Sequence, residues 1–208
     1  GLIVSCYTAK EQNPLFNYPE AMAALVGSVE AGGAAAIRVN VQWIPLFKSL
    51  VKLPIIGIKK VFRGNEMRVT PTLREVEEIA QAGADAVAID ATARPRFDDL
   101  TLEQFIGKIK LNFKLTVLGD ISIAEEGRQA ADWGIDGVST TLSGYTPYSP
   151  NYGHLGEIPP KEPDYQLIDD LRKVIQNPVI CEGRINTPEK ALLALEHGAH
   201  AVVVGTAI

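Results

Sequence analysis

Short apolar runs recur along the chain, and each follows a stretch of helical periodicity that ends in a glycine. Gly32 and Gly83 are 51 residues apart, as are Gly83 and Gly134, and Gly198 is the fourth such glycine. Each stands where the C-terminus of a helix favours a left-handed residue. The repeat therefore predicts helices that alternate with strands, at about 25 residues for each strand–helix unit.

Eight of the apolar runs qualify as strands, because they are short and nearly uninterrupted, as is typical of parallel strands buried on both faces. They span residues 2–5, 34–37, 55–58, 86–89, 116–118, 137–138, 179–181 and 201–204. Eight regular units in 208 residues favour an α/β fold of the closed (β/α)8 type, a TIM barrel. An open, doubly wound sheet is the alternative.

Helix starts are predicted between these strands by capping residues. Thr72 with Glu75 and Ser122 with Glu125 have the spacing of capping boxes. Thr187 precedes a proline, which is the usual order of an N-cap and the first helical residue.

Polar residues follow five of the eight runs, at the strand ends where barrels of this kind carry their chemistry. These residues are Arg38 with Asn40 two positions on, Lys59 and Lys60, Asp90, Asp120, and Glu182. Any one of them alone is most simply interpreted as a solvated charge at the end of a strand. Their convergence on one edge of the sheet favours a functional site.

Side chains alternate between the two faces of a strand, and this predicts which strand-end residues enter the barrel. Lys60 shares a face with Ile58 and is expected to point inward, whereas Lys59 is expected to point toward the helices. Asp120 and Glu182 likewise share faces with the apolar residues two positions before them.

Two glycine-containing segments have the composition of a phosphate site. Gly183 and Arg184 follow the seventh strand, and Gly205 and Thr206 follow the eighth. Backbone N–H groups in the loops after these two strands are the recurrent phosphate site of the fold. We therefore expect a phosphorylated substrate to place its phosphate there.

A metal is not expected. Asp90, Asp120 and Glu182 carry oxygen ligands that could hold Mg²⁺. None of the three histidines stands at the C-terminal end of a strand, so a histidine-based metal cluster would be misplaced.

Composition narrows the range of partners. The net charge is −5 with no long basic run, which argues against nucleic acid. No apolar stretch approaches the ~20 residues of a membrane-spanning helix. The two cysteines, Cys6 and Cys181, form neither a disulfide framework nor a metal-binding spacing. We expect a cytoplasmic protein without a membrane partner.

Seven blocks of sequence occur in the order of a known family, and TTLSGYT is the most specific of them. They are IVSC (3–6), PIIGI (54–58), IDAT (89–92), GDIS (119–122), TTLSGYT (140–146), EGRI (182–185) and VVGTAI (203–208). Together they resemble N-acylglucosamine-6-phosphate 2-epimerase, also called N-acetylmannosamine-6-phosphate epimerase, of sialic acid catabolism. The resemblance implies a barrel of the ribulose-phosphate-binding type, active without a redox cofactor. It also suggests a homodimer.

Carried over position by position, the resemblance implies that Lys60 and Glu182 are catalytic. It implies substrate contacts for Arg38 and Asp120, and a phosphate end at Gly183, Arg184, Gly205 and Thr206. The strand-end residues Asn40 and Asp90, and Thr141 of the specific block, complete the expected substrate site.

The hypothesis is that Lys60 moves the proton on C2 of the sugar while Glu182 assists ring opening. A free lysine, with a pKa of about 10.4, is a poor base at neutral pH. Burial near Arg38 is expected to lower that pKa.

The sequence departs from the family at three places. Tyr7 stands where the family commonly has a substrate-contacting glutamine, and Lys59 replaces an apolar residue, where it is expected to perturb the Lys60 pKa. The chain begins without Met and stops at Ile208, where the family continues with a final helix. We therefore expect a trimmed single barrel domain over residues 1–208 that lacks its last helix.

Other functions stay open at this point. A Schiff-base lyase would use Lys60 as a nucleophile, and a catalytically silent barrel would only bind a sugar phosphate. A metal-dependent pentose-phosphate epimerase is disfavoured by the placement of the histidines. The irregular stretch 142–163 is either a lid or a surface loop.

Overall fold

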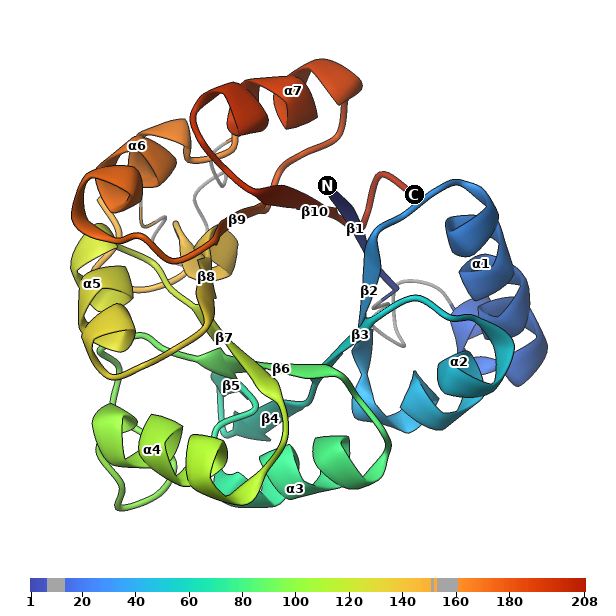
Figure 1. Ribbon diagram of the computed structural model, residues 1–208, viewed down its shortest axis with the longest axis horizontal. Coiled ribbons are helices and arrows are strands. Elements are labelled where there is room, and N and C mark those ends of the chain that lie inside the picture. The colour runs from blue at the N-terminus through green and yellow to red at the C-terminus, as the bar shows by residue number, and fades with distance from the viewer. Residues whose placement is uncertain (7–13, 151, 153–160) are drawn as a thin grey trace.

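Eight parallel strands close into a barrel in the computed structural model, which describes residues 1–6, 14–150, 152 and 161–208. Figure 1 looks down this barrel, with helices around its outside. Because β1 pairs with both β2 and β10, the expected (β/α)8 barrel is confirmed and the open sheet is wrong. The barrel strands are β1 (Leu2–Ser5), β2 (Ala36–Asn40), β3 (Ile55–Ile58), β6 (Ala86–Asp90), β7 (Thr116–Asp120), β8 (Gly137–Ser139), β9 (Val179–Glu182) and β10 (Ala201–Val204).

Helices cover the barrel between successive strands. They are α1 (Pro19–Ala31), α2 (Ile44–Leu50), α3 (Leu73–Gln81), α4 (Leu102–Asn112), α5 (Ala124–Asp132), α6 (Tyr165–Val174) and α7 (Pro188–Glu196), with short 3-10 helices η1 (Pro14–Asn17), η2 (Val41–Trp43) and η3 (Thr140–Leu142). In the part of the chain that the structure describes, no helix is long and apolar enough to cross a membrane.

Two of the three expected helix starts are confirmed. The Thr72 N–H donates to the Glu75 carboxylate at 3.1 Å, and Thr187 accepts a hydrogen bond from the first turn of α7. At the third start Ser122 pairs with Glu126, not with Glu125, because α5 begins one residue later than expected. The capping carboxylate is therefore that of Glu126, which is buried.

Three of the four repeat glycines have the expected left-handed conformation. Gly83, Gly134 and Gly198 have φ values of 91°, 87° and 97°. In the first unit the expectation is wrong, since Gly32 is right-handed with φ −73° and Gly33 takes φ 80°. The helix turn there continues one residue further before the chain reverses.

Alternation along the strands sorts the apolar residues into two layers. One layer fills the inside of the barrel and the other packs between the strands and the helices. The buried inner layer consists of Ile3, Ile56, Ile58, Val69, Ala86, Ala88, Leu118, Ile180 and Val203. The expected inward face of β3, β7 and β9 is therefore confirmed.

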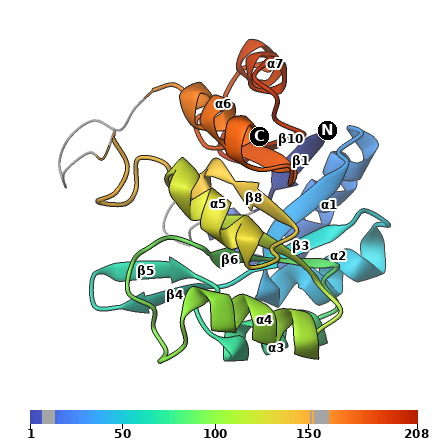
Figure 2. The same ribbon diagram turned by 60° about the vertical axis from the view of Figure 1, so that its left-hand side comes forward.

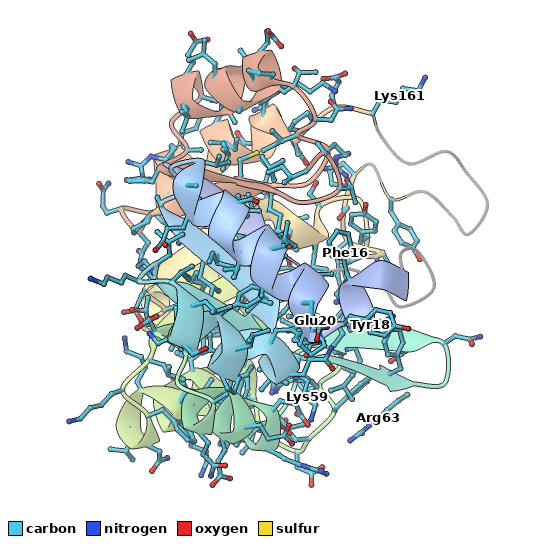
Figure 3. The ribbon with its side chains drawn as sticks, turned by 90° about the vertical axis from the view of Figure 1, so that its right-hand side faces the viewer. Phe16, Tyr18, Glu20, Lys59, Arg63 and Lys161 are labelled. Carbon is cyan, nitrogen blue, oxygen red and sulfur yellow. The ribbon has the colours of Figure 1, made fainter. Side chains whose placement is uncertain are left out.

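A β-hairpin that the sequence analysis did not predict follows β3 at its C-terminal end. It pairs β4 (Lys60–Arg63) with β5 (Glu66–Val69), and Gly64 supplies the left-handed turn with φ 57°. Val69 packs among the residues inside the barrel, so the hairpin begins and ends over the barrel opening. Figure 2 shows it on the same side as the segment after β8, and Figure 3 labels Arg63 of its first strand.

Candidate active site

A buried ion cluster occupies the barrel opening at the C-terminal ends of β2, β7 and β9. Arg38 binds the Asp120 carboxylate with two hydrogen bonds, Nη1–Oδ1 at 2.9 Å and Nη2–Oδ2 at 2.6 Å. Glu182 Oε2 lies 3.2 Å from Nη1 of the same guanidinium. The side chains of Arg38, Asp120 and Glu182 are 4%, 0% and 16% exposed, so water screens these charges poorly.

Two carboxylates and one guanidinium set the charge states in this cluster. Burial by itself would lower the pKa of Arg38, but the charges of Asp120 and Glu182 outweigh it and raise that pKa. For Glu182, burial raises the pKa, and Arg38 opposes that rise. A permanently charged Arg38 therefore lies beside a carboxyl group that is unusually ready to hold a proton.

Thr141 connects the two carboxylates. Its Oγ1 lies 2.9 Å from Asp120 Oδ1 and 3.0 Å from Glu182 Oε2. Ser139 Oγ lies 2.9 Å from Thr141 Oγ1 and belongs to the cluster, although the sequence analysis did not name it. The sequence feature that points to Ser139 is its place at the end of β8, on the face opposite the buried Val138.

Lys60 begins the hairpin and faces this cluster, as the alternation predicted. Burial lowers the pKa of Lys60, and the charge of Arg38 lowers it further, while Glu182 and Asp120 act in the opposite direction. The lysine is therefore easier to deprotonate than a lysine in water, which is what acid–base work near neutral pH requires. Both causes named in the sequence analysis, burial and Arg38, are confirmed.

Lys59 points toward the helix layer, also as predicted, where its Nζ forms an ion pair with Glu78 of α3. The charges of Arg38, Glu182 and Asp120 act on the Lys60 pKa. The perturbation of Lys60 by Lys59 stays a prediction. Glu78 neutralises Lys59 on the other side of the strand.

Asp90 lies next to Asp120 in the register of β6 and β7. It forms an ion pair with Arg94, and its Oδ1 accepts hydrogen bonds from the hydroxyl and the N–H of Thr92. Arg68 of β5 brings its Nε to 3.8 Å from Asp90 Oδ2. Both arginines were missed, since their approach to Asp90 depends on the hairpin and on the loop after β6.

The segments expected to hold phosphate come from neighbouring strands. Since β9 and β10 pair in parallel, Gly183 and Arg184 emerge beside Gly205 and Thr206. Gly183 and Arg184 both have left-handed backbone, with φ 107° and 63°. In the described structure the Arg184 Nη1 donates to the Ser143 carbonyl at 3.0 Å, while its buried Nε has no hydrogen-bond partner. A cation and an unused donor at this end suit an anionic group.

The remaining expected residues are less informative. Asn40 ends β2 on the same face as Arg38 and is half-buried. Tyr7 and His154 lie outside the described residues, as does most of 151–160. The described start of the 142–163 stretch packs against the barrel, where Thr146 donates to Ser122 at 2.7 Å.

Among the described residues, no group of three or more His, Cys, Asp or Glu is placed to hold a metal ion. Asp120 and Asp90 instead point their oxygens at arginines. His197 pairs with Asp169 at 2.9 Å, and His200 accepts a hydrogen bond from the start of β9. Those two histidines therefore have structural contacts away from the barrel opening.

A closed barrel that carries a lysine of lowered pKa and a buried ion cluster at the C-terminal ends of its strands is a (β/α)8-barrel enzyme equipped for acid–base chemistry. The sequence profile of the family described as "Putative N-acetylmannosamine-6-phosphate epimerase" matches residues 21–208. The chain belongs to this epimerase family.

Similar proteins span the whole chain. A protein of Caldanaerobacter subterraneus subsp. tengcongensis is 48% identical, over 100% of this chain and 85% of its own length. One of Cutibacterium acnes is 43% identical, over 100% and 87%. Both are named "Putative N-acetylmannosamine-6-phosphate 2-epimerase".

A solved structure has the same architecture. The N-acetylmannosamine-6-phosphate 2-epimerase from Clostridium perfringens superposes with a TM-score of 0.89 at 41% identity, covering 100% of this chain and 86% of that one. Thiamine phosphate pyrophosphorylase from Pyrococcus furiosus, at 14% identity and a TM-score of 0.63, shares the fold alone.

Proposed function

We propose that this protein interconverts N-acetylmannosamine 6-phosphate and N-acetylglucosamine 6-phosphate by removing and returning the proton on C2. The observation that carries the proposal is Lys60, whose pKa is lowered by burial and by Arg38, facing the Arg38–Asp120–Glu182 cluster. The family to which the chain belongs supports the choice of substrate.

The chemistry requires a base at one carbon of an opened sugar. Ring opening exposes an aldehyde at C1, and that aldehyde makes the proton on C2 acidic. Removal of this proton and its return to the opposite face exchange the manno and gluco configurations. Lys60 in its neutral form takes the proton from C2, and the lowered pKa increases the neutral fraction at a given pH.

Glu182 and the ion pair beside it perform the other steps. Glu182, whose pKa is raised by burial, exchanges protons with the sugar oxygens during ring opening. Asp120 and Arg38 hold the hydroxyl and acetamido groups of the sugar. Their mutual hydrogen bonds fix both side chains in place, so the groups that contact the substrate are already oriented. Asn40 and Asp90 border the same opening as further substrate contacts, and Thr141 contacts the carboxylates of Asp120 and Glu182.

The phosphate binds at the ends of β9 and β10. Arg184 supplies positive charge and an unused Nε donor, and the backbone at Gly183, Gly205 and Thr206 supplies N–H groups. A phosphate anchored there leaves C1 and C2 of the extended sugar to reach toward Lys60 and Glu182. This proposal needs neither a metal nor a redox cofactor.

The test is incubation with N-acetylmannosamine 6-phosphate in D₂O, followed at C2 by NMR. We expect deuterium at C2 together with the gluco epimer. Lys60→Met should lower turnover by at least about 1,000-fold, in the range that loss of a general base produces. Lys173→Met is the matched control, because Lys173 is an exposed lysine of α6 that pairs with its helix neighbour Asp170.

The proposal fails if folded protein neither exchanges the C2 proton nor forms the epimer. The assignment of Lys60 fails separately if Lys60→Met keeps near-normal turnover. Borohydride added during turnover distinguishes the Schiff-base alternative, since only a lysine adduct would be trapped. Proton transfer predicts that no adduct forms.

We also propose that the protein works in the cytoplasm as a homodimer. Two buried free thiols, Cys6 and Cys181, suit a reducing compartment. The family resemblance supports the dimer, which sedimentation equilibrium would test. A net charge of −5 supports a small-molecule partner and not nucleic acid.

A further inference from the structure

Thr141 has more hydrogen-bond partners than its hydroxyl has protons. Its Oγ1 lies within 3.0 Å of three oxygens, those of Asp120, Ser139 and Glu182. A hydroxyl group donates one hydrogen bond and accepts up to two. The Thr141 proton can therefore point at only one of the two carboxylates at a time.

The protonation state of Glu182 determines which carboxylate receives that proton. When Glu182 is ionised, its Oε2 accepts a hydrogen bond from the Thr141 hydroxyl at 3.0 Å, beside Arg38 Nη1 at 3.2 Å. When Glu182 is protonated, its own O–H donates to Thr141 Oγ1, and the Thr141 proton turns to Asp120 Oδ1 at 2.9 Å. Ser139 Oγ lies 2.9 Å from Thr141 Oγ1 and itself donates to Glu182 Oε2 at 3.5 Å.

We propose that Thr141 is a positioning residue whose hydroxyl rotates between Asp120 and Glu182, so that Glu182 keeps its hydrogen bond to Thr141 whether it is ionised or protonated. The proposal rests on the proposed function, in which Glu182 exchanges protons with the sugar. In ring opening the C1–O5 bond breaks, O5 gains a proton and the C1 hydroxyl loses one. Glu182 donates the first proton and recovers the second, and Thr141 turns once in each direction.

The rest of the cluster keeps the free-energy cost of this rotation low. Asp120 keeps both of its hydrogen bonds to Arg38 whichever way Thr141 points, so it is not left unpaired when the hydroxyl turns away. The charged groups that act on Glu182 are Arg38 from β2, Asp120 from β7 and Lys60 from the hairpin. None of them has to move. A rotating hydroxyl replaces the water that an exposed carboxyl group would use.

Thr140 provides a matched comparison one residue away. Its hydroxyl accepts from the N–H of Glu182 at 3.0 Å and donates to the carbonyl of Glu182 at 3.1 Å. Thr140 therefore holds the main chain of Glu182, whereas Thr141 contacts its carboxylate. Loss of either hydroxyl removes contacts to the same residue, but only Thr141 acts on the titrating group.

The experiment compares Thr141→Val, Thr141→Ser and Thr140→Val by ¹³C NMR titration of the Glu182 carboxyl carbon, with Glu182→Gln used to assign the signal. Valine keeps the shape of threonine without the hydroxyl. Since a donor to the ionised carboxylate stabilises it, Thr141→Val should raise the Glu182 pKa by about 0.5 to 1 pH unit. Thr141→Ser should restore most of the shift, and Thr140→Val should lower Tm and leave the titration in place.

Turnover gives the second measurement. We expect Thr141→Val to lower kcat about 10- to 100-fold with little change in KM, and to move the limb of the pH profile that belongs to Glu182 to higher pH. An unmoved titration in Thr141→Val, or an equal shift in Thr140→Val, would overturn the proposal. Because the titration needs no substrate, it reports on Thr141 even if the wild-type protein fails to epimerise the sugar.

Discussion

Lys60 is the residue at which stability and proposed function oppose each other. Its ammonium group is partly removed from water beside Arg38, and this is why its pKa falls. The same interaction that makes the lysine a usable base makes its protonated form unfavourable in the folded protein. Because side chains alternate along a strand, Lys60 faces the barrel interior and Lys59 faces the helices. Lys59 forms an ion pair with Glu78 there.

We expect Lys60→Met to raise the Tm by about 2 to 4 °C at pH 7, measured by calorimetry. The folded pKa of Lys60 lies below its ordinary value of 10.5, so the folded state binds fewer protons in the window between the two values. The cost of burying the charge is therefore fully present below the folded pKa and disappears as the pH rises to about 10.5. The gain in Tm should vanish over the same window.

Lys173→Met serves again as the control for stability. Lys173 forms an exposed ion pair with Asp170 within α6, so its loss should leave the Tm nearly unchanged. A Lys60→Met protein that is less stable than the wild type at pH 7 would contradict the argument.

The close approach of β3 to its covering helices is the feature of interest among the elements. Gly57 sits on the outer face of β3, and a Cβ built there would meet Ile79 Cγ2 at 2.4 Å and Ile44 Cδ1 at 2.9 Å. The strand that leads to Lys60 therefore packs against α2 and α3 at a distance that only glycine permits.

Gly57→Ala should lower the free energy of unfolding by about 1 to 3 kcal/mol in urea denaturation, as expected of an overpacked core. Gly107→Ala is the opposite case, since Gly107 lies exposed in α4 and a Cβ added to it would meet nothing within 4 Å. That substitution should raise stability by about 0.5 to 1 kcal/mol through helix propensity. Equal effects of the two substitutions would show that the contact behind β3 is not tight.

Closure of the barrel buries both thiols of the molecule, one in each half of the chain. Cys6 follows β1 and Cys181 lies in β9, and both pack in the layer between strands and helices. Burial raises the pKa of Cys6 to about 12 and that of Cys181 to about 11. Neither thiol is therefore available as a thiolate at neutral pH while the barrel stays closed.

We expect no labelling of either cysteine by a thiol reagent at pH 8 in the folded protein, and stoichiometric labelling of both in urea. The single variants Cys6→Ser and Cys181→Ser assign the two reactions. Because the strands form one closed sheet, the two thiols should become reactive at the same urea concentration. Labelling of one thiol well before the other would show that the barrel opens in parts.

Much of the barrel and most of the candidate site follow from local rules that the sequence carries by itself. The period of two along a strand predicts that Ile58, Lys60, Asp120 and Glu182 face inward, and this prediction needs no knowledge of strand pairing. Helix caps were placed to within a residue, and the errors at Gly32 and Ser122 came from helices that end or begin one position later than their signals. These features depend on neighbouring residues only.

Contacts between residues far apart in the chain were decided by the tertiary structure. The β4–β5 hairpin has a glycine in its turn, Gly64, which the sequence shows. Its position over the barrel opening depends on the packing of Val69 inside the barrel. Strand register decided that Thr141 would reach both Asp120 and Glu182, 21 and 41 residues away. Composition and spacing name the residues that can do chemistry, whereas closure of the sheet determines which of them share a proton, because register is a property of the whole barrel.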